Sequence, residues 1–256
     1  MAKGRPRGSS DRTFVKRMAG AAALGVAAVL AMSASARADL IDVQFGPAGS
    51  TAAYSGAAVL GTSGDQWNVV TGTFDTTANG IALKDASGSA TPVALSYNAG
   101  FGPGFENVAR SGGIFAGTPY QNLLTTYMDT VSGIPITVAL SGLTPDASYE
   151  LALYSVANRV GRSTQFTVNG TVETVRTTST TALTEGVNYA EFTTTADASG
   201  DLSAVVAQDP FNPDEGDLNG FQLLQVPSAA VPEPASLALF GTALIGLGLI
   251  RRRRSP

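Results

Sequence analysis

The chain contains no cysteine and no histidine among its 256 residues. Without cysteine it can form no disulfide bond and has no thiol nucleophile. Without histidine it lacks the usual general base of hydrolases and the nitrogen ligand of common zinc sites. These absences exclude several classes of active site, and we expect a protein that is not an enzyme.

Charged residues are also few, at 14% of the chain, and they are unevenly placed. Of sixteen basic residues, seven lie at or before Arg37 and four at 251–254, which leaves five between them. Of twenty acidic residues, all but Asp11 and Glu233 lie in residues 39–227, so that region carries a net charge of 5 − 18 = −13. Such a charge disfavours nucleic acid and anionic lipid as partners and attracts divalent cations.

The N-terminus has the pattern of a secretory signal peptide. Six basic residues and one acid precede an apolar run, Met18 to Met32, and small residues follow at alternate positions. This order predicts a signal peptide over residues 1–38, with Ala36 and Ala38 before the cleavage point and export through the Sec translocon. A retained N-terminal anchor is the alternative.

The chain ends in three consecutive pieces: Pro232-Glu233-Pro234, an apolar run over 235–250, and the arginines Arg251, Arg252, Arg253 and Arg254. As a helix, sixteen residues reach roughly 24 Å, short of the roughly 30 Å hydrocarbon core of a bilayer. Arginine stems that extend to the headgroups, together with local thinning of the bilayer, make up the difference. We therefore expect one transmembrane helix with its arginines on the cytoplasmic side.

This arrangement resembles the PEP-CTERM protein-sorting signal, over residues 232–256 after a short linker at 228–231. The resemblance implies recognition by an exosortase, a membrane-embedded transpeptidase-like cysteine protease that cleaves near Pro-Glu-Pro. It also implies a Gram-negative host that makes exopolysaccharide. The protein would be inserted transiently in the inner membrane and then reach the cell envelope, the outer surface or the extracellular matrix. An ordinary C-terminal membrane anchor is the alternative.

The exported domain, residues 39–227, has the pattern of an all-β protein, and it is long enough to bury its own core. In the first segment Ile41, Val43 and Phe45 share one face, and Asp42 and Gln44 share the other. Many short strands in a domain of this size predict a two-sheet sandwich that is jelly-roll-like. The expected strands are Leu40–Phe45, Trp67–Phe74, Ile81–Leu83, Val93–Tyr97, Ile136–Leu140, Tyr149–Val156, Thr164–Val168, Thr171–Arg176, Tyr189–Thr194, Leu202–Gln208 and Phe221–Val226.

Two local patterns refine this fold. Asn169-Gly170 between two β-rich runs indicates a type I′ hairpin, because both positions need a positive φ. The segments IDVQFG, GDQWN, SGLTPDASYELALYS and LNGFQLLQV are similar, in that order, to galactose-binding-like jelly rolls. That resemblance implies that the last strand, Asn219 to Val226, pairs with the first, Leu40 to Phe45. It transfers no ligand, since no binding residue matches.

Aromatic residues are the first candidates for a binding site, because an exposed ring can stack on the C–H face of a sugar. The glycine-rich stretch 100–133 is expected to be a binding loop. Its candidate sugar platform comprises Phe105, Phe115, Tyr120 and Tyr127. The single tryptophan, Trp67, either stacks on a sugar or caps the core.

An acidic loop near the end of the domain is the candidate metal site. It offers Asp209, Asn212, Asp214 and Asp217, whose oxygens suit calcium. Their spacing does not fit an EF-hand, and a solvated acidic turn is the alternative. No other cofactor is expected.

These features predict a secreted, exosortase-sorted protein with a structural or adhesive role in exopolysaccharide or biofilm. A carbohydrate-binding module with a defined sugar site is the alternative. A polysaccharide-active enzyme is a distant one, because glycosidase chemistry needs only two suitably spaced carboxylates, a pattern without specificity in so acidic a domain.

We predict that the protein recovered from its native culture lacks both terminal signals. Its intact mass should correspond to a chain that begins at Asp39 and ends near Pro232-Glu233-Pro234. A mass that retains Met1 and the terminal arginines would contradict this assignment.

Overall fold

A computed structural model describes residues 40–49, 51–73, 77–98, 104–107, 113–130, 133–156, 159–212 and 215–227. None of the helices in these ranges is long and apolar enough to cross a membrane. The residues of the two terminal signals lie outside the described ranges: Ala36, Ala38, Pro232, Glu233, Pro234, Arg251, Arg252, Arg253 and Arg254.

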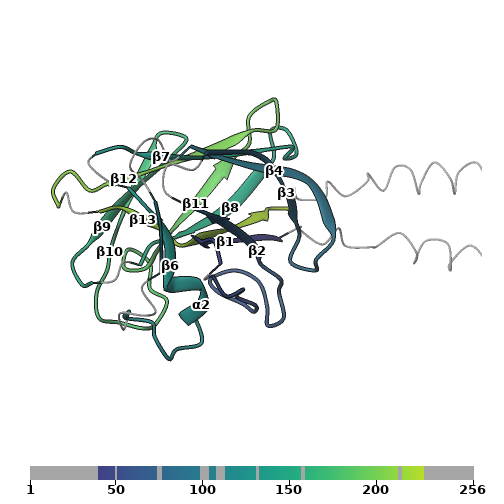
Figure 1. The fold of residues 1–256 in the computed structure, drawn as a ribbon. Coiled ribbons are helices and arrows are strands. Elements are labelled where there is room, and N and C mark those ends of the chain that lie inside the picture. The colour runs from purple at the N-terminus through teal and green to yellow at the C-terminus, as the bar shows by residue number, and fades with distance from the viewer. Residues whose placement is uncertain are drawn as a thin grey trace, which may run out of the picture. The chain divides into compact units, whose positions relative to one another are not determined.

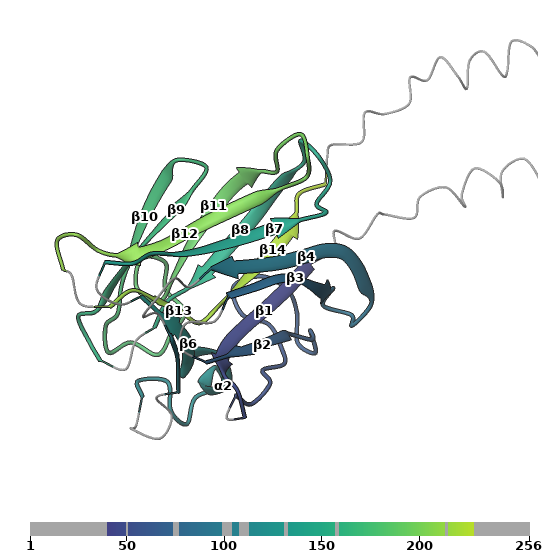
Figure 2. The same cartoon turned by 45° about the horizontal axis from the view of Figure 1, so that its top comes forward.

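Two large β-sheets pack face to face as a sandwich (Figure 1). The five-stranded sheet runs in the order β11 (Tyr189–Thr195), β8 (Ser148–Tyr154), β14 (Gly220–Gln225), β1 (Leu40–Pro47) and β2 (Asn68–Gly72). The six-stranded sheet runs β10 (Thr171–Arg176), β9 (Ser163–Val168), β12 (Leu202–Gln208), β7 (Ile136–Ser141), β4 (Ala90–Asn98) and β3 (Thr77–Lys84) (Figure 2). The predicted all-β sandwich is confirmed, and each of the eleven expected strands is present.

The structure also contains a third, small sheet. Two of its strands come from residues 100–133, the stretch that was expected to be a binding loop, and the third strand follows β12 in the chain. The sheet consists of β13 (Asp217–Leu218), β6 (Thr126–Asp129) and β5 (Gly104–Asn107), and the short helix α2 (Gln121–Leu124) precedes β6. The sequence did not predict these elements, because each is too short to show a period.

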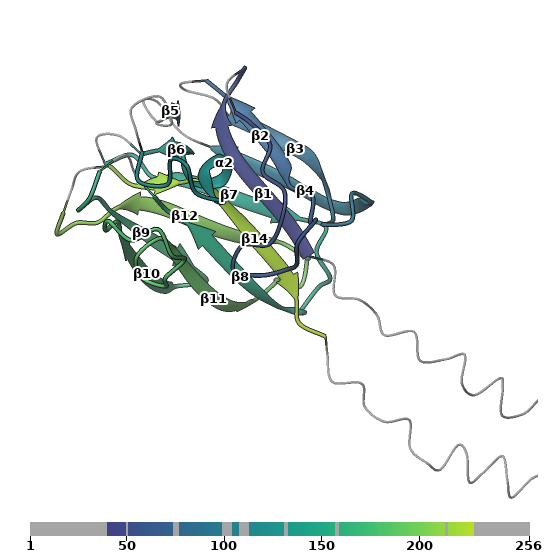
Figure 3. The same ribbon diagram turned by 90° about the horizontal axis from the view of Figure 1, so that it is seen from below.

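The first and last strands pair within the five-stranded sheet (Figure 3). β1 runs antiparallel to β14, with Leu40 opposite Leu224, and parallel to β2. The pairing implied by the jelly-roll resemblance is therefore confirmed. The type I′ hairpin is also confirmed, since Asn169 and Gly170 have φ values of 47° and 80°.

The main core fills the space between the two sheets. Phe45 from β1 meets Tyr97 from β4 edge to face, with ring centroids 6.2 Å apart. Strands of the six-stranded sheet alternate between buried and more exposed residues, as the pattern of β7 shows. That sheet therefore has one face in the core and one toward solvent, which is usual for antiparallel sheets.

The five-stranded sheet differs, because its central strands are buried on both faces. Residues 51–66, here called the covering segment, lie against its outer face. A second apolar cluster forms between them, and it includes Tyr54, Trp67, Tyr154 and the α2 residue Leu123. Alternation in β1 correctly predicted which side chains face the core, but the polar side chains opposite them are not solvated.

Asn68, the first residue of β2, joins the two sheets at one edge of the sandwich. Its side-chain amide donates to the carbonyl of Asp42 at 2.9 Å and to that of Lys84 at 2.8 Å. Its side-chain oxygen accepts from the Lys84 amide at 2.9 Å. One side chain thus takes the place of a strand-to-strand ladder between β2 and β3.

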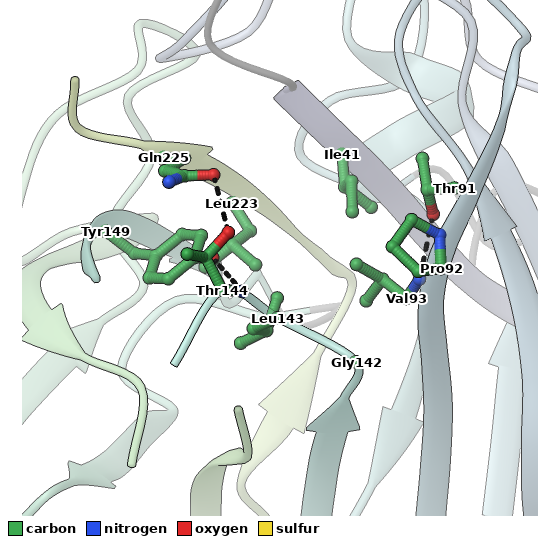
Figure 4. A pocket seen from close by; sticks show the side chains of 10 residues that line it. All are labelled: Ile41, Thr91, Pro92, Val93, Gly142, Leu143, Thr144, Tyr149, Leu223 and Gln225. Carbon is green, nitrogen blue, oxygen red and sulfur yellow. Dashed lines mark hydrogen bonds between the residues drawn. The ribbon is translucent and has the colours of Figure 1, made fainter. Parts of the chain in front are cut away.

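A small pocket and the turn after β12 lie at opposite ends of the sandwich. At one end, β1 begins and β14 ends beside a small apolar pocket of about 60 Å³, and Figure 4 shows Ile41 and Gln225 among its lining. β12 begins near this end, since Leu143 donates to the carbonyl of Gly200. Seven residues of β12 then span roughly 20 Å, so the turn after β12 lies at the opposite end.

We predict that Asn68→Ala lowers the free energy of unfolding by about 1–2 kcal/mol, because it removes three hydrogen bonds, of which two are near solvent. Chemical denaturation measures this. Gln66→Ala is the matched control, since the exposed Gln66 makes one long contact of 3.4 Å. Equal denaturation midpoints for Asn68→Ala and Gln66→Ala would show that the side-chain amide of Asn68 does not join the sheets.

Candidate functional site: a polar cleft beside the single tryptophan

A polar cleft of about 260 Å³ opens at the edge where β2 and β3 approach each other. Its lining comes from the start of β2 and from the end of β3 with the turn that follows: Gln66, Trp67, Asn68, Val69, Lys84, Asp85 and Gly88. The cleft has room for one small polar group such as a sugar ring. It is larger than the apolar pocket of about 60 Å³ that Ile41 and Gln225 line.

The charged side chains of the cleft have distinct roles. Asp85 accepts from the Ser87 hydroxyl at 2.6 Å and from the backbone amides of Ser87 and Ser89, and these bonds lower its pKa. The Asp85 carboxylate therefore stabilises the turn that follows β3. Lys84, the single lysine of the exported domain, is exposed and forms no ion pair with any residue that the structure describes. Its ammonium group therefore gives the cleft a cation that is unpaired among the described residues.

Trp67 forms one wall of the cleft and is otherwise packed in the second apolar cluster. It is 7% exposed, and its ring centroid lies 5.2 Å from that of Tyr54 and 6.2 Å from that of Tyr154. Its indole N–H donates to the carbonyl of Gly56 at 2.9 Å. Of the two alternatives for this tryptophan, the core position fits better, because most of the ring is buried. A ligand can contact only its small exposed edge.

Two buried glutamines hold the covering segment in place. Gln44 on β1 donates to the carbonyl of Ala52 at 3.0 Å and accepts from the amide of Tyr54 at 2.9 Å. Gln222 on β14 accepts from the Leu60 amide at 2.8 Å and donates to the Leu60 carbonyl at 2.9 Å. Each side-chain amide pairs with backbone as a neighbouring strand would, so the segment is docked without forming a strand of the sheet.

Gln222 also contacts two titratable groups beneath the covering segment. Its side-chain N–H donates to the Asp42 Oδ1 atom at 2.7 Å, and its oxygen accepts from the Tyr154 hydroxyl at 2.5 Å. The same hydroxyl accepts from the Val59 amide at 2.8 Å. Burial raises the pKa of Tyr154 well above its ordinary value. The network thus links β1, β8 and β14 to the covering segment.

The candidate sugar platform is not assembled as the sequence suggested. Phe115 and Tyr127 are each 1% exposed, so neither offers a ring face to a sugar, and the expectation for these two residues does not hold. Tyr120 is half-buried and packs against Tyr54 and Phe115. Phe105 lies in β5, and its side chain is outside the described part of the chain. Aromatic density in a glycine-rich stretch here reflects an additional core.

The candidate metal ligands are largely engaged in local hydrogen bonds. The Asp209 carboxylate accepts from the Ser163 hydroxyl at 2.9 Å and from the Phe211 amide at 3.0 Å. The Asn212 amide donates to the carbonyl of Gly161. These bonds make residues 209–212 a turn fixed to the neighbouring loop.

Asp217 lies apart from that turn, buried in β13, where Arg162 approaches its carboxylate at 3.8 Å. Arg162 also forms an ion pair with Glu215. Asp214 lies outside the described residues. Within the described ranges no three acidic side chains are grouped so that they could hold a metal ion. Calcium binding by this loop stays a prediction.

One exposed aromatic residue was not identified from the sequence. Phe211 is 95% exposed on the fixed turn, and Val160 in the neighbouring loop is 60% exposed. Proline and acidic residues flank Phe211 and drew attention to metal binding. The sequence signal that could have identified it is a phenylalanine that lies between turn-forming residues and outside any strand pattern.

Several solved structures are similar to the chain. The plant receptor-like kinase FER matches with 12% identity and a TM-score of 0.40, over 75% of this chain and 43% of that one. An exo-beta-1,3-galactanase from Phanerochaete chrysosporium with galactose matches with 14% identity and a TM-score of 0.30, over 55% and 32%. TmCBM61 in complex with beta-1,4-galactotriose matches with 14% identity and a TM-score of 0.28, over 53% and 89%. The chain thus spans less than half of the receptor kinase, and these likenesses carry no functional argument.

No curated protein matches the chain. The model of the PEP-CTERM protein-sorting motif matches residues 230–254, about a tenth of the chain. The match includes Pro232-Glu233-Pro234, the apolar run and the four arginines. The motif implies exosortase processing and indicates an exported cell-surface protein. The protein therefore carries a PEP-CTERM sorting motif at its C-terminus, ahead of which lies a β-sandwich.

Proposed function

We propose that the protein has a non-enzymatic, structural or adhesive role in the exopolysaccharide at the surface of a Gram-negative bacterium. The sorting motif supports the cellular location. The net charge of −13 in residues 39–227 supports a partner other than nucleic acid or anionic lipid. The Sec translocon and an exosortase would act on the chain during export.

The observation that carries the adhesive role is the presentation of Phe211. Its turn is fixed by the Asp209 carboxylate, which accepts from the Phe211 amide and from Ser163 on β9. The ring is therefore held out in solvent on a rigid support, at 95% exposure. A fixed exposed ring loses little conformational freedom on binding, which favours contact with a partner.

The position of Phe211 selects the kind of partner. The sorting motif follows β14 in the chain, and the turn after β12 lies at the end of the sandwich opposite the end of β14 at Gln225 (Figure 2). The ring is therefore presented at the end of the sandwich remote from the end of the last described strand. Like charge on a second copy opposes self-association, whereas the C–H face of a neutral sugar meets no repulsion.

The polar cleft favours a second candidate function, a carbohydrate-binding module with a defined sugar site. It combines the edge of Trp67, the exposed amide of Gln66 and the ammonium group of Lys84. Small-molecule sites have this character, with a few polar groups beside an aromatic wall. The cleft would hold a single sugar unit that is hydrogen-bonded through its hydroxyl groups.

We predict that Phe211→Ala weakens retention of the purified domain on exopolysaccharide from the native culture by about two- to twelvefold, as expected for a ring contact worth about 0.5–1.5 kcal/mol. Affinity electrophoresis in gels that contain the polysaccharide measures this. Val172→Ala is the matched control, because Val172 is 49% exposed on the edge strand β10. Equal retention of both variants and the unaltered domain would contradict a role for the ring.

We predict separately that Lys84→Ala weakens the binding of soluble oligosaccharides made from the same polysaccharide, while Phe211→Ala leaves that binding unchanged. Titration calorimetry with the purified domain measures both. Arg176→Ala is the control, since it removes an exposed cation from β10, away from the cleft. Oligosaccharide binding that all three variants retain would argue against the cleft.

A further inference from the structure

Asp42 is a carboxyl group enclosed by protein on every side. Its side chain is 0% exposed, and it lies on the outer face of β1 beneath the covering segment. Its Oδ1 atom accepts one hydrogen bond, from Gln222. Its Oδ2 atom has no hydrogen-bond partner among the described residues. A carboxylate so enclosed is costly when charged, because it has lost its water and gained one donor.

Among the described residues, the groups that face Asp42 offer no compensating positive charge. The covering segment contributes the carboxyl group of Asp65, which is itself buried, and β14 contributes the neutral amide of Gln222. The hydroxyl groups of Tyr154 on β8 and Tyr54 in the covering segment are neutral near pH 7, because burial raises both pKa values above 10. On the β2 side, Lys84 is exposed in the cleft.

We propose that Asp42 is a pH-sensitive latch: while it is protonated the covering segment stays docked through Gln222, and its ionisation releases the segment from the sheet. The strands around Asp42 are held by continuous ladders, with five registered pairs between β1 and β14 alone. The covering segment contains no strand, and it is held by side-chain hydrogen bonds and by the second apolar cluster rather than by a ladder. Its movement is therefore the least costly way to bring water to the carboxylate.

The direction of the pH effect follows from the pKa. Burial raises the pKa of Asp42 from 3.8 to about 7, the hydrogen bond from Gln222 opposes this, and the Asp65 carboxyl group adds to it. The folded state thus keeps a proton that the unfolded state loses above pH 3.8. Stability is fully present below that pH, falls as pH rises towards 7, and levels off above it.

Release of the covering segment would also change the cleft. The Trp67 indole is bonded to Gly56 in that segment and packs on Tyr154, whose hydroxyl shares Gln222 with Asp42. Loss of these contacts moves one wall of the cleft. This consequence for ligand binding rests on the second candidate function, whereas the latch itself does not.

The single tryptophan makes the latch directly observable. In buffers containing EDTA, the Trp67 emission of the purified domain is expected to shift to longer wavelength as pH rises, with a midpoint near 7. The urea midpoint is expected to fall between about pH 4 and 7 and then level off. Asp42→Asn, which keeps the size of the side chain, should abolish both changes. An unshifted emission in the folded domain, or the same transition in Asp42→Asn, would overturn the proposal.

A second variant protects the test against misfolding of the first. Asp65→Asn removes the neighbouring negative charge and should move the emission midpoint to lower pH, while an unmoved midpoint would contradict the assignment to Asp42. Oligosaccharide binding measured over the same pH range separates the two hypotheses. An emission transition without binding at any pH would reject the cleft as a sugar site and support the latch.

Discussion

The structure depends on two side-chain amides that hold a non-strand segment against a sheet. Gln44 and Gln222 each offer one donor and one acceptor to the backbone of the covering segment. Buried backbone groups must be paired, and a segment without a ladder of its own has few ways to meet that requirement. These amides supply the pairing, and they allow the outer face of the five-stranded sheet to be buried.

Docking of the covering segment also forms the second apolar cluster and, through it, one wall of the cleft. Once the covering segment is docked, Tyr54 and Trp67 can pack on Tyr154, and the edge of the Trp67 ring becomes a wall beside β3. Asn68 on β2 then fixes the distance to β3, because its side chain bonds to the backbone of Asp42 on β1 and of Lys84 on β3. The site is therefore built from side chains that replace missing strand pairing, and small changes in them alter its shape.

Alternation and turn chemistry were enough to predict the strands, because each large sheet has one face in a common core. The Asn169-Gly170 turn followed from a local signal of this kind, whereas the return of the last strand to the first followed from the resemblance to jelly rolls. What alternation cannot reveal is whether the polar side of a strand meets water. Asp42 and Gln44 have the pattern of solvated residues and are both 0% exposed.

For the same reason, alternation does not reveal which aromatic residues are buried. Phe115 belongs to the layer that covers the five-stranded sheet and Tyr127 to the small third sheet, so neither ring is available. No periodicity marks such layers, since they consist of loops and very short elements. Conversely, Phe211 has no sequence signature beyond its turn-forming neighbours, and its exposure follows from the bonds of Asp209. Both errors arise from tertiary packing that short-range patterns do not contain.

The buried carboxyl group is the part of this arrangement that the fold does not require. Asparagine at position 42 would have nearly the same volume and would accept the same hydrogen bond from Gln222. A shift of the Asp42 pKa from 3.8 to about 7 corresponds to a loss of about 4 kcal/mol of stability between acid and neutral pH. This is a large share of the net stability of an ordinary domain, which is about 5–15 kcal/mol. A local cost that packing does not demand is typical of a functional position, and here it lies beneath the covering segment, which forms no strand of either large sheet.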